Sequence, residues 1–152
     1  MVKTPEELAP AIQFAFSENS AVLVEQGIEG RELTCAAYLA GGQVRTLPLI
    51  EIVTENEYFD YDAKYNGHSR EICPAPVSDD ECGLVSRTTV ELYRHLGCKG
   101  VVRIDYILSE DGLYFLEVNT IPGMTSASLV PRMVRTAGLD MTEFLTTIIE
   151  NS

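Results

Sequence analysis

Hydrophobic and polar positions divide the chain into stretches of helical and strand-like spacing. Thr4-Pro5-Glu6-Glu7 combines a capping threonine, a first-turn proline and a capping-box glutamate, and apolar residues follow at helical spacing. The stretch 21–26 is rich in β-forming residues and predicts a strand. Two further strands, over 32–40 and 43–52, meet at Gly41-Gly42, which is typical of a β-hairpin turn.

The middle of the chain predicts a long loop and a helix. Residues 53–76 have little regular pattern, and a connection of this length is usually functional or mobile. Ser78-Asp79-Asp80-Glu81 forms another capping box, and the helix that it starts is expected to end at Gly97. One apolar face runs along this helix, formed by Cys82, Val85, Thr89, Leu92 and Leu96.

The last third predicts a second hairpin and two helices. Strands are expected over 101–108 and 113–119, and helices over 127–137 and 141–150, separated by Gly138. Strands joined by short turns form antiparallel sheets, so the sequence predicts an α+β fold in which helices cover an antiparallel sheet.

Composition narrows the possible functions. The 152 residues include 11 Lys+Arg and 23 Asp+Glu, for a formal net charge of −12. This charge argues against unaided binding to nucleic acid or an anionic membrane, because phosphates are held by clustered cations, although a small phosphorylated ligand remains possible. No apolar run is long enough for a membrane span and no secretory signal opens the chain. The four cysteines lack Cys-x-x-Cys spacing, so we expect reduced thiols in a cytoplasmic protein.

The second hairpin carries the most informative polar residues. A three-residue turn, Glu110-Asp111-Gly112, would pair Ser109 with Leu113. Carried back along the strands, that register sets Asp105 opposite Glu117.

Arg103 and Asp105 share one face of the first strand, and Glu117 and Asn119 share one face of the second. Two opposed carboxylates repel unless a cation lies between them, and these hard oxygen ligands suit Mg²⁺ or Mn²⁺. Arg103 beside them suits a phosphoryl group. The alternative is a solvated polar face on which Arg103 pairs with Asp105 or Glu117, and a one-residue change of register would offset the four groups.

Three other segments are weaker candidates. Thr120 to Leu129 joins a Pro-Gly turn to a Ser/Thr-rich helix start, which is an anion site or simply a turn and a cap. Lys64 and Tyr65 suit a phosphate and a polar substrate, or belong to an ordinary surface loop. Glu25 and Glu32 flank a bend where carboxylates can accept hydrogen bonds from adenine or ribose, although most exposed glutamates have no specific role.

Together these segments resemble the D-alanine–D-alanine ligases of the ATP-grasp superfamily, in order and over nearly the whole chain. The most specific run is Glu117-Val118-Asn119-Thr120-Ile121-Pro122-Gly123-Met124-Thr125. The other matching runs are Val22 to Gln26, Glu29 to Thr34, Tyr58 to Tyr65, Leu96 to Gly100, Arg103 to Asp105, and Ser128 to Pro131.

The resemblance implies an ATP-dependent ligation of two D-alanines for peptidoglycan precursor synthesis. One carboxylate attacks the γ-phosphate of ATP to give a D-alanyl phosphate, and the amine of the second D-alanine displaces phosphate. Asp105, Glu117 and Asn119 match the family's ligands for two Mg²⁺ or Mn²⁺ ions. Arg103 matches the arginine that steadies the phosphoryl group, and the Gly123 N–H matches an oxyanion donor.

The resemblance also implies contacts to both substrates. Ser128 and Leu129 match the carboxylate grip on the second D-alanine, and Tyr65 matches the dipeptide-forming members. The residues that match nucleotide contacts are Glu25, Ile28, Glu32, Lys64, Leu116 and Asn119.

The chain departs from a full member of the family. The sequence has no counterpart of the N-terminal substrate domain or of the glycine-rich phosphate loop, so we expect 1–29 to be the tail of the ATP-grasp central subdomain and 30–152 the C-terminal subdomain. The isolated chain is then expected to be inactive, and the full-length enzyme a homodimer. The alternatives are another ATP-grasp carboxylate–amine ligase or a non-catalytic Mg-nucleotide-binding module.

Overall fold

The computed structural model describes residues 1–54 and 69–151. Its helices and strands follow one another in chain order: α1 (Pro5–Glu18), β1 (Arg31–Ala40), β2 (Gln43–Thr46), β3 (Ile50–Thr54), β4 (Ser69–Ile72), α3 (Asp79–His95), β5 (Val101–Ser109), β6 (Gly112–Asn119), α4 (Leu129–Thr136) and α5 (Met141–Glu150).

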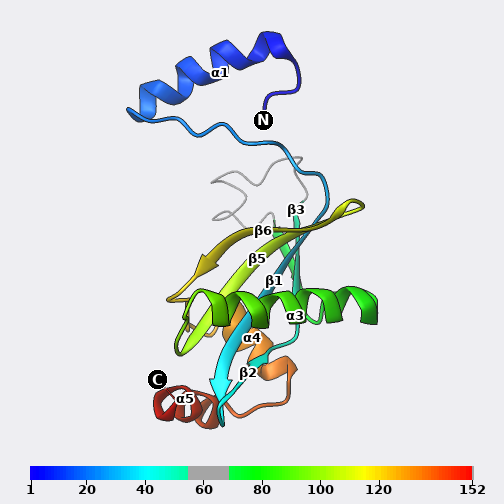
Figure 1. The fold of residues 1–152 in the computed structure, drawn as a ribbon, viewed down its shortest axis with the longest axis vertical. Coiled ribbons are helices and arrows are strands. Elements are labelled where there is room, and N and C mark those ends of the chain that lie inside the picture. Colours follow the sequence, from blue (N-terminus) through cyan, green and yellow to red (C-terminus); the bar gives the residue numbers. More distant parts are fainter. Residues whose placement is uncertain (55–68, 152) are drawn as a thin grey trace.

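The strands form one antiparallel sheet in the order β4-β3-β1-β5-β6, and β2 also pairs with β1. Helix α3 covers one face of this sheet, while α4 and α5 cover the other (Figure 1). The predicted α+β fold is therefore confirmed.

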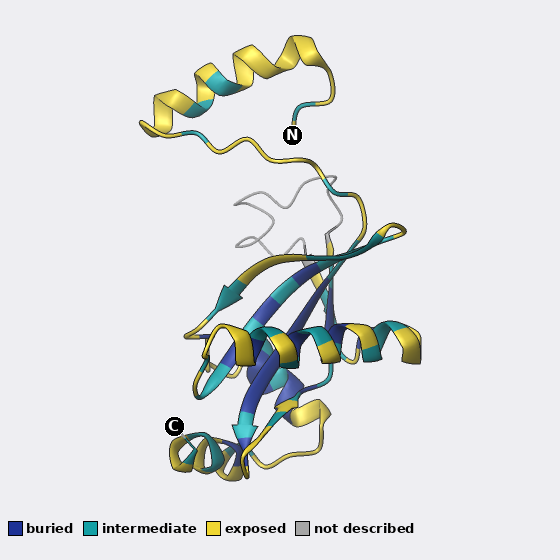
Figure 2. Ribbon diagram, viewed as in Figure 1, coloured by how far each residue is buried: buried dark blue, intermediate teal, exposed yellow. Residues whose placement is uncertain are grey.

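Strand β1 lies at the centre of the molecule and is buried on both faces (Figure 2). Leu33, Cys35 and Ala37 pack in the core beneath α3, whereas Ala36 and Tyr38 pack in the core beneath α4 and α5. Side chains alternate along a strand, so each face of β1 serves a different hydrophobic core. Only a strand covered on both sides needs such a continuous apolar run.

Helix α3 follows the predicted capping box and ends before Gly97, whose φ of 63° suits a glycine. Val85 and Thr89 are buried as predicted. Leu96 was predicted on the same face but is 53% exposed, while Tyr93 is buried there. Leu96 is the C-cap residue, outside the last helical turn, so the helical spacing no longer directs it to the sheet.

Two predictions about strands are wrong. Residues 21–26 pair with none of the described strands, and a strand cannot form without a neighbour for its backbone hydrogen bonds. Conversely, the expected 53–76 loop contains the end of β3 and all of β4. Strand β4 is a short, charged edge strand, a kind whose sequence carries little strand signal.

The first hairpin forms around Gly41-Gly42 as predicted, but its second strand is interrupted. Leu47-Pro48-Leu49 separates β2 from β3, and both strands pair with β1. A proline has no N–H for the sheet, which accounts for the break.

The second hairpin differs from the prediction at its turn and agrees with it farther along. Ser109 pairs with Gly112, which leaves a two-residue turn instead of the expected three-residue turn. A bulge at Leu116 adds one residue to β6, so Asp105 still lies opposite Glu117.

Helix α1 begins at Pro5, as predicted, but buries none of its residues. It lies apart from the sheet, and an extended segment leads from it to β1 (Figures 1 and 2). Helices α4 and α5 form on either side of Gly138, also as predicted. The cysteines are free thiols, and no helix among the described residues is long and apolar enough to cross a membrane.

Candidate functional site

The predicted polar face lies on β5 and on β6, the last strand of the sheet order, on the side of the sheet covered by α4. Arg103 and Asp105 are on β5, between buried residues that face α3. Asp105 lies between Thr34 on β1 and Glu117 on β6, and Arg103 lies opposite Asn119. The register of β1, β5 and β6 therefore sets these side chains in a fixed order across the sheet.

Arg103 and Asp105 form a close ion pair. Arg103 Nε donates to Asp105 Oδ1 at 2.9 Å and Nη2 donates to Oδ2 at 2.8 Å. Thr34 Oγ1 also donates to Asp105 Oδ1. The hydrogen bonds to Asp105 raise the pKa of Arg103, and the charges of Asp105, Glu117 and Glu32 act in the same direction. The side chains of the pair are only 18% and 13% exposed, so solvent screens it weakly.

This ion pair borders a cavity of 390 Å³ that brings together much of the predicted site. It is lined by Glu25, Glu32, Thr34, Ile52, Glu71, Arg103, Asp105, Leu116, Glu117 and Leu129. Residues predicted separately from the Glu25–Glu32 bend, the second hairpin and the start of α4 thus share one cavity. The bulge at Leu116 contributes, because a bulge redirects neighbouring side chains.

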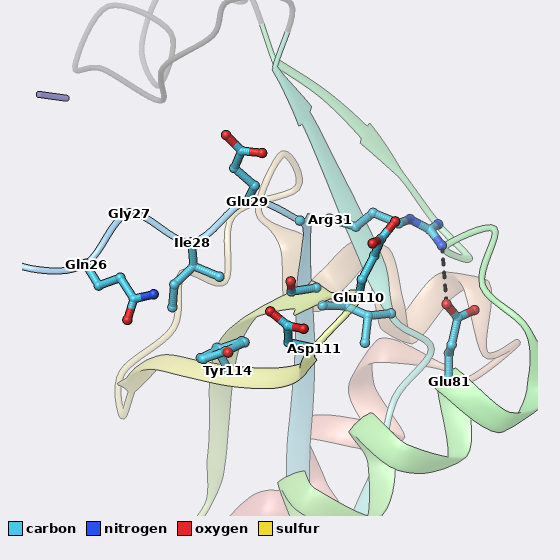
Figure 3. A pocket seen from close by; sticks show the side chains of 12 residues that line it. Gln26, Gly27, Ile28, Glu29, Arg31, Glu81, Glu110, Asp111 and Tyr114 are labelled. Carbon is cyan, nitrogen blue, oxygen red and sulfur yellow. Dashed lines mark ion pairs between the residues drawn. The ribbon is translucent and has the colours of Figure 1, made fainter. Parts of the chain in front are cut away.

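Ile28 lines a different cavity, of 780 Å³, on the other side of the 26–30 segment. Figure 3 shows this segment passing over the β5–β6 turn, where Glu110, Asp111 and Tyr114 form the opposite wall. Arg31 is in this wall too, and its closest carboxylate contact is with Glu51 at 2.8 Å. Leu116 lines the 390 Å³ cavity, so Ile28 and Leu116 line different cavities.

The turn between β6 and α4 is held by short hydrogen bonds. Thr125 N and Oγ1 lie 3.2 Å and 2.8 Å from Ser128 Oγ. A Cβ on Gly123 would lie 2.7 Å from the same oxygen, so a side chain here would displace the Ser128 hydroxyl. Ser128 makes no side-chain cap to α4, and Ser128, Asn119 and Gly123 do not line the 390 Å³ cavity.

Two predicted site residues lie outside the described part of the chain, and two residues of the cavity were not predicted from the sequence. Lys64 and Tyr65 are outside the described residues. Thr34 and Glu71 line the cavity but were not predicted. Thr34 lies in an apolar run with no local signal, and Glu71 lies within the 53–76 stretch that was expected to be irregular. Only the pairing of β1 with β5 and of β3 with β4 places them here.

The side chains that could hold a metal ion at this site are oxygen donors. Asp105 and Glu117 lie opposite each other, and Asn119 lies two residue pairs farther along, opposite Arg103. Asn119 Oδ1 already accepts from Ile121 N at 3.2 Å. Within the described residues, no group of three or more His, Cys, Asp or Glu side chains is arranged to hold a metal. The donor types fit a hard cation, while Arg103 neutralises Asp105 in the arrangement observed.

Comparison with known proteins assigns the family. The profile described as "D-ala D-ala ligase C-terminus" matches residues 1–150. The chain belongs to this family. The chain is 49% identical to the D-alanine–D-alanine ligase of Bacteroides fragilis over 151 residues. The match covers 99% of this chain and 47% of the Bacteroides fragilis protein. The chain thus spans about half the length of the curated relatives that it matches.

Solved structures share the fold of this ligase C-terminus. The VanG D-Ala:D-Ser ligase of Enterococcus faecalis has a TM-score of 0.81 at 34% identity, and 97% of this chain and 43% of that chain are covered. The D-alanine–D-alanine ligase of Bacillus anthracis complexed with ATP has a TM-score of 0.76 at 33% identity, with 99% and 48% covered. The fold is therefore that of the D-Ala-D-Ala ligases.

Proposed function

We propose that this chain forms the metal- and acceptor-binding half of an ATP-dependent ligase that joins two D-alanines through a D-alanyl phosphate. The observation that carries the proposal is the 390 Å³ cavity, where Arg103, Asp105 and Glu117 meet Leu129. A phosphoryl-transfer site needs positive charge and metal-binding oxygens at one place, next to a site for the attacking group. Arg103 supplies the positive charge and Asp105 and Glu117 supply oxygen ligands, and Leu129 lies at the start of α4, where we place the acceptor.

Each group has a distinct part in the proposed reaction. Asp105, Glu117 and Asn119 would hold Mg²⁺ or Mn²⁺, two ions in all, which would supply positive charge to neutralise the phosphates. Arg103 would exchange Asp105 for the transferred phosphoryl group, which suits a guanidinium that already lies at the cavity wall. The Gly123 N–H would donate to the tetrahedral intermediate, and Ser128 and Leu129 would hold the acceptor carboxylate at the start of α4.

The nucleotide would be contacted by Glu25, Ile28, Glu32, Lys64, Leu116 and Asn119. Tyr65 would contact the substrate.

We further propose that 1–29 belongs to a neighbouring ATP-grasp subdomain and that 30–152 forms the C-terminal one, because α1 buries nothing against the sheet. The isolated chain is then inactive, since phosphoryl transfer needs both walls of the cleft. We place the full-length enzyme, as a homodimer, in peptidoglycan precursor synthesis in the cytoplasm.

A fusion of this chain to the N-terminal part of the Bacteroides fragilis relative tests the proposal. We expect D-alanine-dependent phosphate release from ATP with formation of D-alanyl-D-alanine, and its loss in Asp105→Ala and Glu117→Ala. Asp111→Ala is the matched control, because Asp111 is an exposed carboxylate on the turn of the same hairpin, outside the cavity. If a folded fusion releases phosphate at a rate that does not depend on D-alanine, D-alanine is not its substrate.

A second acceptor is worth testing, because one structural neighbour is a D-Ala:D-Ser ligase. D-Serine should therefore be compared with D-alanine as the acceptor in the same assay. A higher kcat/KM for D-serine would retain the carboxylate–amine ligase and change only the amino acid pair.

A further inference from the structure

An ion pair outside the predicted site joins the edge of the sheet to α4. Arg132 Nη1 lies 2.7 Å from Glu71 Oε2 and donates to the main-chain oxygen of Glu71 at 3.2 Å. Glu71 is on β4, at the end of the sheet order, where it pairs with β3 alone. One guanidinium thus binds both the side chain and the backbone of an edge-strand residue.

The pair lies beside the cavity at the end nearest α4. Glu71 and Leu129 both line the cavity. Leu129 and Arg132 are three residues apart in α4, so they lie on the same side of the helix. The pair therefore connects the β4 wall of the cavity to the α4 wall that carries Leu129.

The rest of α4 is held by apolar packing. Val130, Met133 and Val134 are buried against the sheet. Apolar burial is non-directional, so it holds the helix against the sheet but constrains its rotation and sliding less tightly. A charge-assisted hydrogen bond has a defined direction, so Arg132 can fix the orientation of the first turn of α4.

Charge gives the pair a second effect. The cavity lining contains five carboxylates, those of Glu25, Glu32, Glu71, Asp105 and Glu117, and the guanidinium of Arg103. Arg132 neutralises Glu71, the carboxylate that β4 contributes to this lining. An amino acid carboxylate that approaches α4 would otherwise meet a like charge there.

We propose that Glu71 and Arg132 are positioning residues for the acceptor amino acid: their ion pair orients the first turn of α4 and neutralises the cavity wall where the acceptor carboxylate binds. This inference rests on the proposed function. It adds a specific origin for acceptor affinity, at a pair of residues that are not among the proposed nucleotide contacts or metal ligands.

The test compares Arg132→Met with a matched pair elsewhere in the fold, in the fusion enzyme. Arg132→Met keeps the long side chain but leaves Glu71 charged and unpaired, and we expect the KM for the acceptor to rise about fivefold, as for a partly exposed pair. The KM for ATP and kcat should change less than about twofold. Arg132→Lys should restore the acceptor KM to within about twofold, because the ammonium still reaches the carboxylate.

Arg31→Met is the control, because Arg31 similarly binds a carboxylate, Glu51, and a main-chain oxygen, that of Pro76, but lies outside this cavity. It should leave the acceptor KM unchanged. An unchanged acceptor KM in Arg132→Met, or an equal change in the KM for ATP, would overturn the inference while the ligase assignment stands. Absence of dipeptide from the unsubstituted fusion would overturn the proposed function first.

Hydrogen exchange on the chain itself tests whether the ion pair orients α4, and this measurement does not require enzymatic activity. In Arg132→Met, amides of β4 and of α4 beyond its first turn should exchange faster together, and Arg132→Lys should reverse this change. The amides of β1 and β5 should exchange unchanged, which reports that the fold is intact. If β4 and α4 exchange as in the unsubstituted chain, the pair does not orient this turn and the inference fails.

Discussion

Residues 1–29 and the described residues from 30 onward, 30–54 and 69–151, have similar apolar patterns but opposite burial. In the first region α1 buries no side chain, and Phe14 and Leu23 are 72% and 80% exposed. In the second, β1 and β5 bury Leu33, Ile104 and Tyr106 completely. Both regions have periodic hydrophobic residues, so periodicity does not account for the difference.

The contrast teaches that a pattern identifies the apolar side of an element but not the surface that covers it. Helix α3 has a sheet face to pack against, whereas α1 meets no such surface among the described residues. A helix without a packing surface contributes little to stability, because most helical stability in proteins comes from tertiary packing. The two regions should therefore respond differently to the same kind of substitution.

The largest expected difference comes from truncating one apolar side chain in each region. Ile104→Ala removes a fully buried side chain from the central sheet and should lower the free energy of unfolding by about 2–5 kcal/mol. Leu23→Ala should change it by less than about 0.5 kcal/mol. Urea denaturation followed by circular dichroism measures both values. Equal losses would mean that 1–29 is packed as firmly as the sheet.

The second prediction concerns the ion pair within the cavity. Arg103→Met leaves the largely buried Asp105 without its cation, and we expect a loss of about 1–3 kcal/mol. Added Mn²⁺ should restore more stability to this variant than to the unsubstituted chain, because the metal binds the folded state. Arg45→Met, at an exposed position on β2 of the same sheet, is the control and should show neither effect. If Mn²⁺ stabilises all three chains equally, the metal does not bind Asp105.

The third prediction is a pH dependence that arises only from the sheet region. Burial raises the pKa of Cys35 to about 12, so the folded chain keeps this thiol protonated where an unfolded chain ionises it. A raised folded pKa gives stability that is complete below the unfolded pKa of about 8.5 and is lost as the pH rises towards the folded value. We expect a loss on the order of 1 kcal/mol by about pH 9.5.

Denaturation at successive pH values checks this expectation, with Cys35→Ala as the comparison. The variant should be less stable at neutral pH but should lose less stability on going to alkaline pH. Parallel curves for the two chains would show that Cys35 does not set the slope.

The sequence predicts those parts of the fold and site that depend on local rules. Alternation along a strand is enough to put Arg103 and Asp105 on one face, and the capping box at Ser78 locates the start of α3. The pairing of Asp105 with Glu117 was predicted from an incorrect turn. A shorter turn and a bulge at Leu116 offset each other, so the register is the same beyond the bulge.

The rest depends on contacts between distant segments. Thr34 donates to Asp105, 71 residues away in sequence, and Arg132 binds Glu71, 61 residues away. No local sequence pattern predicts either contact, because the two residues of each pair come together only when distant segments pack in the fold. Ile28 shows the same dependence: the family resemblance assigns it to the nucleotide together with Glu25 and Glu32, but it lines a different cavity from theirs.

The smallest expected effect is the most direct test of the comparison. Deletion of residues 1–29 removes α1 and the extended segment but no fully buried side chain, so the free energy of unfolding of the sheet region should change by less than about 0.5 kcal/mol. The far-ultraviolet signal of α1 should disappear, while the alkaline loss of stability assigned to Cys35 stays the same. If the chain unfolds or aggregates after the deletion, residues 1–29 stabilise the sheet through contacts that do not bury their side chains. In that case the two regions would form one cooperative unit, and the difference in their burial would not reflect a difference in stability.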